Sequence, residues 1–165
     1  MSGYLPAFWS DFSGAAVASS SALIGLLFVA VSINLDEILA NSTLTERTLY
    51  TMILFTVAFV VGMLLLLPEQ PRTALGVELT ITGAAAGAAL LRINRPGKRG
   101  EREPQWGWLL VRLVPSVTIT MFLVVGGLSL IAGVGGGLYW VAPAVIEAFL
   151  AGLTTVWILL IEIRR

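Results

Sequence analysis

Hydrophobic residues gather into five long runs along the chain, and most polar residues lie in the short stretches between them. A helix rises about 1.5 Å per residue, so about 20 apolar residues cross the hydrocarbon core of a bilayer. Each run reaches about that length. The pattern therefore predicts an all-α integral membrane protein with five transmembrane helices, at about 13–35, 49–67, 73–91, 108–132 and 138–163.

A polar turn at 68–72, which contains Pro68 and Pro71, separates the second run from the third. Because proline interrupts the hydrogen bonding of a helix, we expect two spans here rather than one. Composition agrees with a membrane setting, since the chain is 57% hydrophobic and 12% charged. Its mean hydropathy is +0.90. We expect residues 1–165 to form one transmembrane domain.

The distribution of basic residues predicts the orientation of the spans. Cytoplasmic segments of membrane proteins are enriched in Lys and Arg. With the N-terminus outside and the C-terminus inside, the outer segments hold one basic residue, Arg72. The inner segments then include a basic cytoplasmic loop at 94–105. Apart from Arg112, which lies within the fourth run, all the other basic residues are on the inner side: Arg47, Arg92, Arg95, Lys98, Arg99, Arg102, Arg164 and Arg165.

Small and polar residues follow one helical face of the first run. Positions spaced alternately by four and three share a face of a helix, and here they are Asp11, Ala15, Ala18, Ala22, Gly25, Val29, Ser32 and Asp36. Around the axis of a symmetric oligomer this face would line a pore with acidic rings at its mouths, and such rings select cations. The other interpretation is a packing face, with Asp11 and Asp36 solvated at its ends.

Glu147 lies about ten residues inside the fifth run, near the middle of the membrane. A charge there costs roughly 2.5 to 3.5 kcal/mol on insertion scales. Three hydroxyl residues of the fourth run, Ser116, Thr118 and Thr120, lie at similar depth and are candidate hydrogen-bond partners. Two interpretations follow: a neutral, hydrogen-bonded acid that fixes helix register, or a site that handles a proton or a cation.

The predicted spans contain three further charged residues, Glu78, Arg112 and Glu162. Glu78 is near the outer end of the third run, where it reaches interfacial water. Arg112 is near the inner end of the fourth, where it either extends to the surface or pairs with Glu162. Pro115 leaves the carbonyl of Val111 without its helical donor, which predicts a local kink.

Small residues at helical spacing mark two close-packing surfaces. One is on the third run and one on the fifth, and they comprise Gly83, Gly87, Ala144, Ala148 and Gly152. The chain contains no Cys and no His, and it shows no phosphate loop, no metal-ligand pattern and no nucleophile beside a base. We therefore expect that the protein is not an enzyme and that it has no cofactor, no metal site and no nucleic-acid partner.

The segment SALIGLLFVAVSINLDEIL (21–39), followed by a second span that ends in LLPEQ (66–70), resembles a group of small bacterial membrane proteins. Members of that group are often labelled modulators of the FtsH membrane protease. The resemblance implies a multi-pass protein of the bacterial inner membrane. It also implies a membrane-protein partner, such as a membrane protease.

The first run is also similar to the pore helix of the Orai calcium channels. Orai subunits have four spans, and the position of their selectivity glutamate falls on Ile33, with Asn34 and Asp36 as the nearest polar residues. The similarity is carried by Ser21, Ala22, Leu23, Gly25, Val29 and Ala30.

These patterns predict a homo-oligomer in the lipid bilayer whose first helix lines a path that conducts or translocates a small ion. The alternative is a non-conducting regulatory or scaffold subunit that binds another membrane protein. The candidate pore or ion-binding residues are Asp11, Gly25, Val29, Ser32, Asn34, Asp36 and Glu147.

Overall fold

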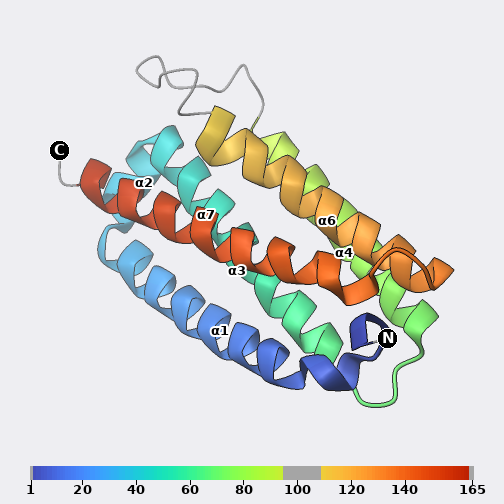
Figure 1. Ribbon diagram of the computed structural model, residues 1–165. Helices are drawn as coiled ribbons and strands as arrows, with labels where there is room; N and C mark the ends of the chain where they lie inside the picture. The colour runs from blue at the N-terminus through green and yellow to red at the C-terminus, as the bar shows by residue number, and fades with distance from the viewer. Residues whose placement is uncertain (1, 95–108, 164–165) are drawn as a thin grey trace.

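The computed structural model describes residues 2–94 and 109–163, and every regular element within them is helical. By length and composition, five helical segments of the described chain can cross a membrane. The predicted all-helical class, with five helices long and apolar enough to span a membrane, is therefore confirmed. Figure 1 shows the five long helices side by side: α1 (Ser10–Ile33), α3 (Ser42–Leu66), α4 (Arg72–Ile93), α6 (Val114–Ala132) and α7 (Val141–Ile163).

The second long helix begins at Ser42, well before the predicted start at 49. Asn41 caps it, because its side-chain oxygen accepts a hydrogen bond from the backbone N–H of Thr43 at 3.0 Å;. The polar first turns are stable here because Arg47 and Thr48 are buried against neighbouring helices. The predicted basic loop at 94–105 lies outside the described residues except for Asn94.

Helix α3 lies at the centre of the bundle. It packs against α1, α4 and α7, while α6 packs against α4 and α7. Its buried side includes Tyr50, Leu54, Phe55 and Val61, none of which has exposed surface. Helix α1 therefore contacts the bundle mainly through α3, and most of its remaining surface faces outward.

The backbones of α4 and α6 approach each other very closely. A Cβ atom on Gly127 would lie 2.5 Å from the carbonyl oxygen of Gly76. One on Gly83 would lie 2.8 Å from the Cβ of Leu123, and one on Gly87 would lie 2.5 Å from Thr120 Oγ1. Only glycine fits at these contacts without moving a helix.

The second predicted packing surface lies on the buried side of α7. Ala144 and Ala148 are almost fully buried. A Cβ atom on Gly152 would lie 2.9 Å from Phe55 Cζ on α3. The small residues of α7 therefore lie at its packing contacts with neighbouring helices.

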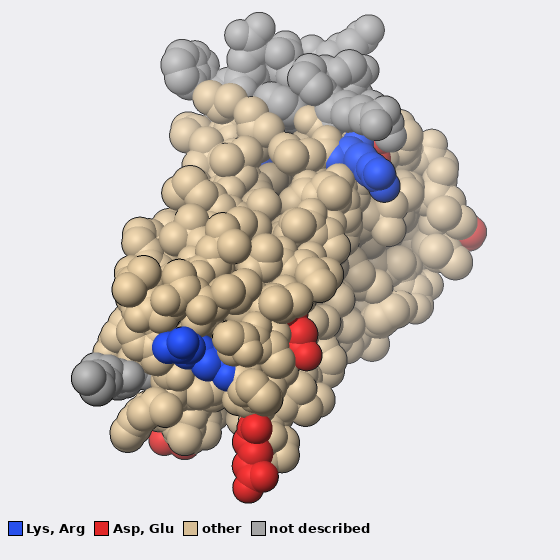
Figure 2. Space-filling view, turned by 90° about the vertical axis from the view of Figure 1, so that its right-hand side faces the viewer, with Lys and Arg blue, Asp and Glu red and all other residues tan. Residues whose placement is uncertain are grey.

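The outward surfaces of the long helices are apolar. Leu26 on α1, Ile81 on α4 and Leu150 on α7 are each more than 60% exposed. Figure 2 shows small groups of charged side chains separated by broad uncharged areas. A surface of this kind fits contact with lipid hydrocarbon.

The bundle has two distinct ends, which we name by the chain terminus that lies at each (Figure 1). At the amino end, the short helices η1 (Ser2–Tyr4) and η2 (Pro6–Trp9) pack near η5 (Gly137–Trp140). The hydroxyl of Tyr4 accepts a hydrogen bond from the backbone N–H of Gly136 at 2.8 Å. The carboxyl end contains α2 (Leu35–Ala40) and the π-helical turn η4 (Leu109–Leu113).

Candidate functional sites

The small-residue face of α1 lies on the outside of the bundle. All seven of its residues within the helix are exposed, and no other described element covers them. A Cβ atom on Gly25 would meet no described atom of a neighbouring element within 4 Å. We call this surface the α1 outer face; it comprises Asp11, Ala15, Ala18, Ala22, Gly25, Val29 and Ser32.

The hydroxyl group on the α1 outer face already donates a hydrogen bond within its own helix. Ser32 Oγ donates to the carbonyl oxygen of Phe28 at 2.8 Å. Ser21, beside the face, donates in the same way to Val17 at 2.7 Å. Because these donors are already used, the face can contact lipid, another helix or water without a hydrogen bond being lost.

Asp36 lies beyond the end of α1 and belongs to the next helix, α2. Helix α1 ends at Ile33, and Asn34 follows with a non-helical backbone. The side chain of Asn34 donates to the carbonyl oxygen of Ala30 at 2.8 Å and so closes the helix. Asp36 stands in the first turn of α2 and is exposed. The asparagine was a signal for this break, since it favours helix ends.

Glu147 lies between α6 and α7, away from the α1 outer face. Its Oε1 atom is 2.5 Å from Thr118 Oγ1 on α6. Of the three hydroxyls predicted at this depth, the other two are bonded elsewhere: Ser116 donates to the carbonyl oxygen of Arg112, and Thr120 to that of Ser116. The candidate ion-binding residues therefore fall into two separate places.

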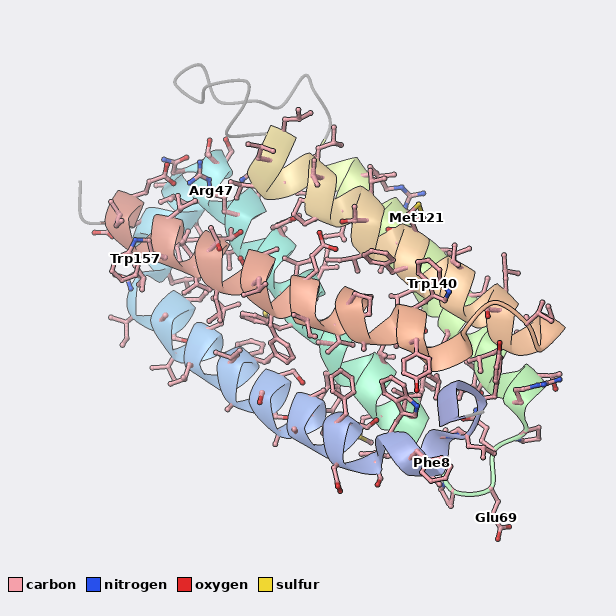
Figure 3. The ribbon with its side chains drawn as sticks, viewed as in Figure 1. Phe8, Arg47, Glu69, Met121, Trp140 and Trp157 are labelled. Atoms are coloured by element: carbon pink, nitrogen blue, oxygen red, sulfur yellow. The ribbon has the colours of Figure 1, made fainter. Side chains whose placement is uncertain are left out.

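A cluster of buried polar residues fills the carboxyl end of the bundle. Arg47 and Arg112 are 6% and 4% exposed, and Asn94 is 3% exposed. Arg47 Nη1 lies 2.7 Å from Glu162 Oε2, so the ion pair of Glu162 is made by α3 rather than by the predicted Arg112. Figure 3 shows Arg47 where α3 and α7 meet at this end. Glu46 and Glu162 are the carboxylates that attract the Arg112 guanidinium.

A π-helical turn, η4, directly precedes α6 at the position where the sequence predicts a kink at Pro115. The side chains of other helices satisfy the carbonyl oxygens that this turn leaves open. Tyr50 Oη is 3.2 Å from the Arg112 carbonyl oxygen and 3.4 Å from that of Val111. Asn94 Nδ2 donates to the Arg112 carbonyl oxygen at 3.4 Å and to Ser116 Oγ at 2.8 Å. Sequence reasoning missed Tyr50 and Asn94, because neither stands near Pro115 in the chain.

Glu78 is half-buried near the amino end. Its Oε2 atom accepts a hydrogen bond of 2.5 Å from Gln70 Nε2, which belongs to the polar turn before α4. The contact joins α4 to the turn that precedes it. This arrangement fits an anchoring role at the membrane interface.

We expect Glu162→Gln to lower the free energy of unfolding by about 1–3 kcal/mol. Removing one partner of a fully buried ion pair typically costs about 3–5 kcal/mol. The cost is smaller here because the Glu162 side chain is 37% exposed. Unfolding in mixed micelles, followed by circular dichroism, measures the change. The double variant Arg47→Met, Glu162→Gln is the control, and it should recover part of the loss because it removes the Arg47 charge together with its carboxylate, while Arg112 keeps Glu46;.

An apolar groove of about 250 Å³ lies between α1 and α7. Phe55 of α3 is among its lining residues, with Leu27 on one side and Leu153 on the other. The groove marks where α1 and α7 diverge after packing on the same central helix. Comparison of this chain with protein-family models, curated proteins and solved structures finds no match.

Proposed function

We propose that the protein is a homo-oligomer of the bacterial inner membrane in which the α1 outer faces of several copies surround a shared axis and conduct a small cation. The observation that carries this proposal is the exposure of the whole face, including Gly25. Small residues let helix backbones of neighbouring subunits come close. Helix α4 also exposes small residues, at Ala84, Ala85 and Ala88, but the exposed small residues of α1 extend along almost its whole length.

Carboxylates near both ends of α1 support cation selectivity. Asp11 is exposed in its first turn, and Asp36 and Glu37 are exposed in the first turn of α2. Repeated around an axis, they would form acidic rings at the two mouths of the path. The ring at the carboxyl end would come from α2 rather than from α1 itself.

The proposed orientation places the amino end outside and the carboxyl end inside. It rests on the sequence bias of basic residues toward the segments that would be cytoplasmic;. The buried arginines Arg47 and Arg112 lie at the same, proposed inner, end.

Cation flux into proteoliposomes tests the proposal. We expect flux above that of empty vesicles, and we expect Asp36→Ala to reduce it about tenfold, the scale on which local charge changes ion entry. Glu78→Gln is the matched control, because it removes a carboxylate that is on neither α1 nor α2. Flux equal to that of empty vesicles would overturn the proposal.

A second candidate function is a non-conducting regulatory or scaffold subunit that binds another membrane protein, such as a membrane protease, through the same face. The hydrogen bond of Ser32 within its own helix favours this candidate, since the face does not require water;. Purification in a gentle detergent separates the two functions. A foreign membrane protein in fixed ratio supports the second, and a homogeneous homo-oligomer argues against it. Neither function involves an enzyme, a cofactor or a nucleic acid.

A further inference from the structure

Thr118 Oγ1 makes two short oxygen–oxygen contacts, one within its own helix and one with Glu147. Thr118 Oγ1 is 2.8 Å from the carbonyl oxygen of Val114 and 2.5 Å from Glu147 Oε1. A hydroxyl group has one proton to donate, and a carbonyl oxygen can only accept. An ionised Glu147 would therefore leave one of these two short oxygen–oxygen contacts without a proton.

A protonated Glu147 resolves this conflict. The carboxylic acid donates to Thr118 Oγ1, and Thr118 donates to Val114, so both contacts are hydrogen bonds. No basic residue of the described chain forms an ion pair with Glu147. Since an unpaired charge in the membrane is costly, the neutral acid is also the form that its surroundings favour.

Polar groups lie on the side of Glu147 that faces the carboxyl end, where Ser116 precedes Thr118 on α6. Tyr50 on α3 lies within electrostatic range of both Glu147 and Arg112. The hydroxyl groups of Tyr50 and Ser116 both contact the carbonyl oxygen of Arg112. The charged groups farther toward that end are Glu46 and Arg47 on α3, Arg112 in η4 and Glu162 on α7.

Toward the amino end, by contrast, apolar and aromatic groups fill the contact between α6 and α7. The rings of Phe122 and Trp140 lie 6.0 Å apart. A Cβ atom on Gly126 would lie 3.1 Å from Val141 Cγ2. Figure 3 shows Trp140 on the amino-end side of the bundle, far from Arg47. The surroundings of Glu147 are thus polar toward one end and apolar toward the other.

We propose that Glu147 is a proton-binding site, neutral at rest, that exchanges its proton with the carboxyl end of the bundle through the polar cluster of Tyr50, Ser116 and Arg112. Thr118 holds the acid by accepting its hydrogen bond. The site is separate from the α1 outer face and does not depend on oligomer formation or on flux.

Labelling of the wild-type protein with dicyclohexylcarbodiimide in liposomes tests the site. This apolar reagent takes up the proton of a carboxylic acid, the carboxyl oxygen adds to its central carbon, and rearrangement gives a stable N-acylurea. In water, roughly one glutamic acid in 500 is protonated at pH 7. We therefore expect peptide mass spectrometry to find Glu147 modified about a hundredfold faster than Glu37, which is exposed.

The side of access is tested by setting the pH inside and outside the vesicles separately. The chain has no cysteine, so Thr73→Cys, at an exposed position of the amino end, reports orientation through a membrane-impermeant maleimide. Raising the pH at the carboxyl end should slow the modification of Glu147, and raising it at the amino end should not. Glu147→Gln should lose the label, while Glu78→Gln should keep it. Modification no faster than that of Glu37, or a rate that follows the pH at the amino end, would overturn the proposal.

Discussion

Gly25→Leu is expected to reduce cation flux to the level of empty vesicles while the subunit stays folded. Gly25 is in the middle of the α1 outer face, and a side chain added there meets no described atom of a neighbouring element within 4 Å. The fold of one subunit should therefore tolerate it. Between subunits, a leucine would hold the α1 backbones apart and remove the close packing that small residues allow. Native mass spectrometry and flux measurements on the same sample report both effects.

Leu128→Phe is the matched control for this variant. Leu128 on α6 is 52% exposed, and α6 is not the helix proposed to face the axis. The enlarged side chain should leave oligomer size and flux unchanged. A Gly25→Leu protein that keeps both its oligomeric mass and full flux would show that α1 does not line the path.

Gly127→Leu is expected to cause the largest loss of stability. The first added carbon would lie 2.5 Å from the Gly76 carbonyl oxygen and 2.9 Å from the backbone nitrogen of Thr80. Overpacking costs typically 1–3 kcal/mol when side chains can adjust. Here backbone atoms oppose the new side chain, so α4 and α6 must separate, and we expect a loss of about 3 kcal/mol or more. Unfolding in mixed micelles measures it.

Gly14→Ala gives the opposite expectation in the same assay. No described atom of a neighbouring element lies within 4 Å of a Cβ atom on Gly14. Alanine should therefore stabilise α1 by about 0.5–1 kcal/mol, because glycine loses more backbone freedom in a helix. Equal effects of the two substitutions would contradict the close contact of α4 with α6.

The five spans could be predicted from the sequence because membrane crossing depends on the length and polarity of each run alone. Contacts between the spans depend on how each helix is rotated about its axis. Arg47 and Arg112 both lie at a depth in the bundle from which their side chains can reach Glu162. The rotation of the helices about their axes brings Arg47, and not Arg112, into the ion pair with Glu162. The spacing of Gly83 and Gly87 marks a small surface, but it does not reveal Gly127 on the opposing helix.

The candidate site on α1 was only partly predictable. The pattern identified a face of small residues, and the structure places that face outside the bundle. The sequence could not decide this, because the first half of the helix has small residues on all sides. The residues that pack against α3 are Ser13, Ala16 and Ser20. Residues on the other sides of this half of the helix are of similar size, so size alone does not select the buried side;. A local signal, Asn34, governs where the face ends.

The hydrogen bond between Tyr4 and Gly136 has a consequence for biosynthesis. Its partners are separated by 132 positions in the chain. Synthesis proceeds from the N-terminus, so the first segment leaves the ribosome well before the α6–α7 connection exists to receive it. Contacts between such distant residues also form slowly, because a long loop must close. The contact of η1 with the α6–α7 connection therefore cannot form until Gly136 has been synthesised, and until then η1 is without this partner.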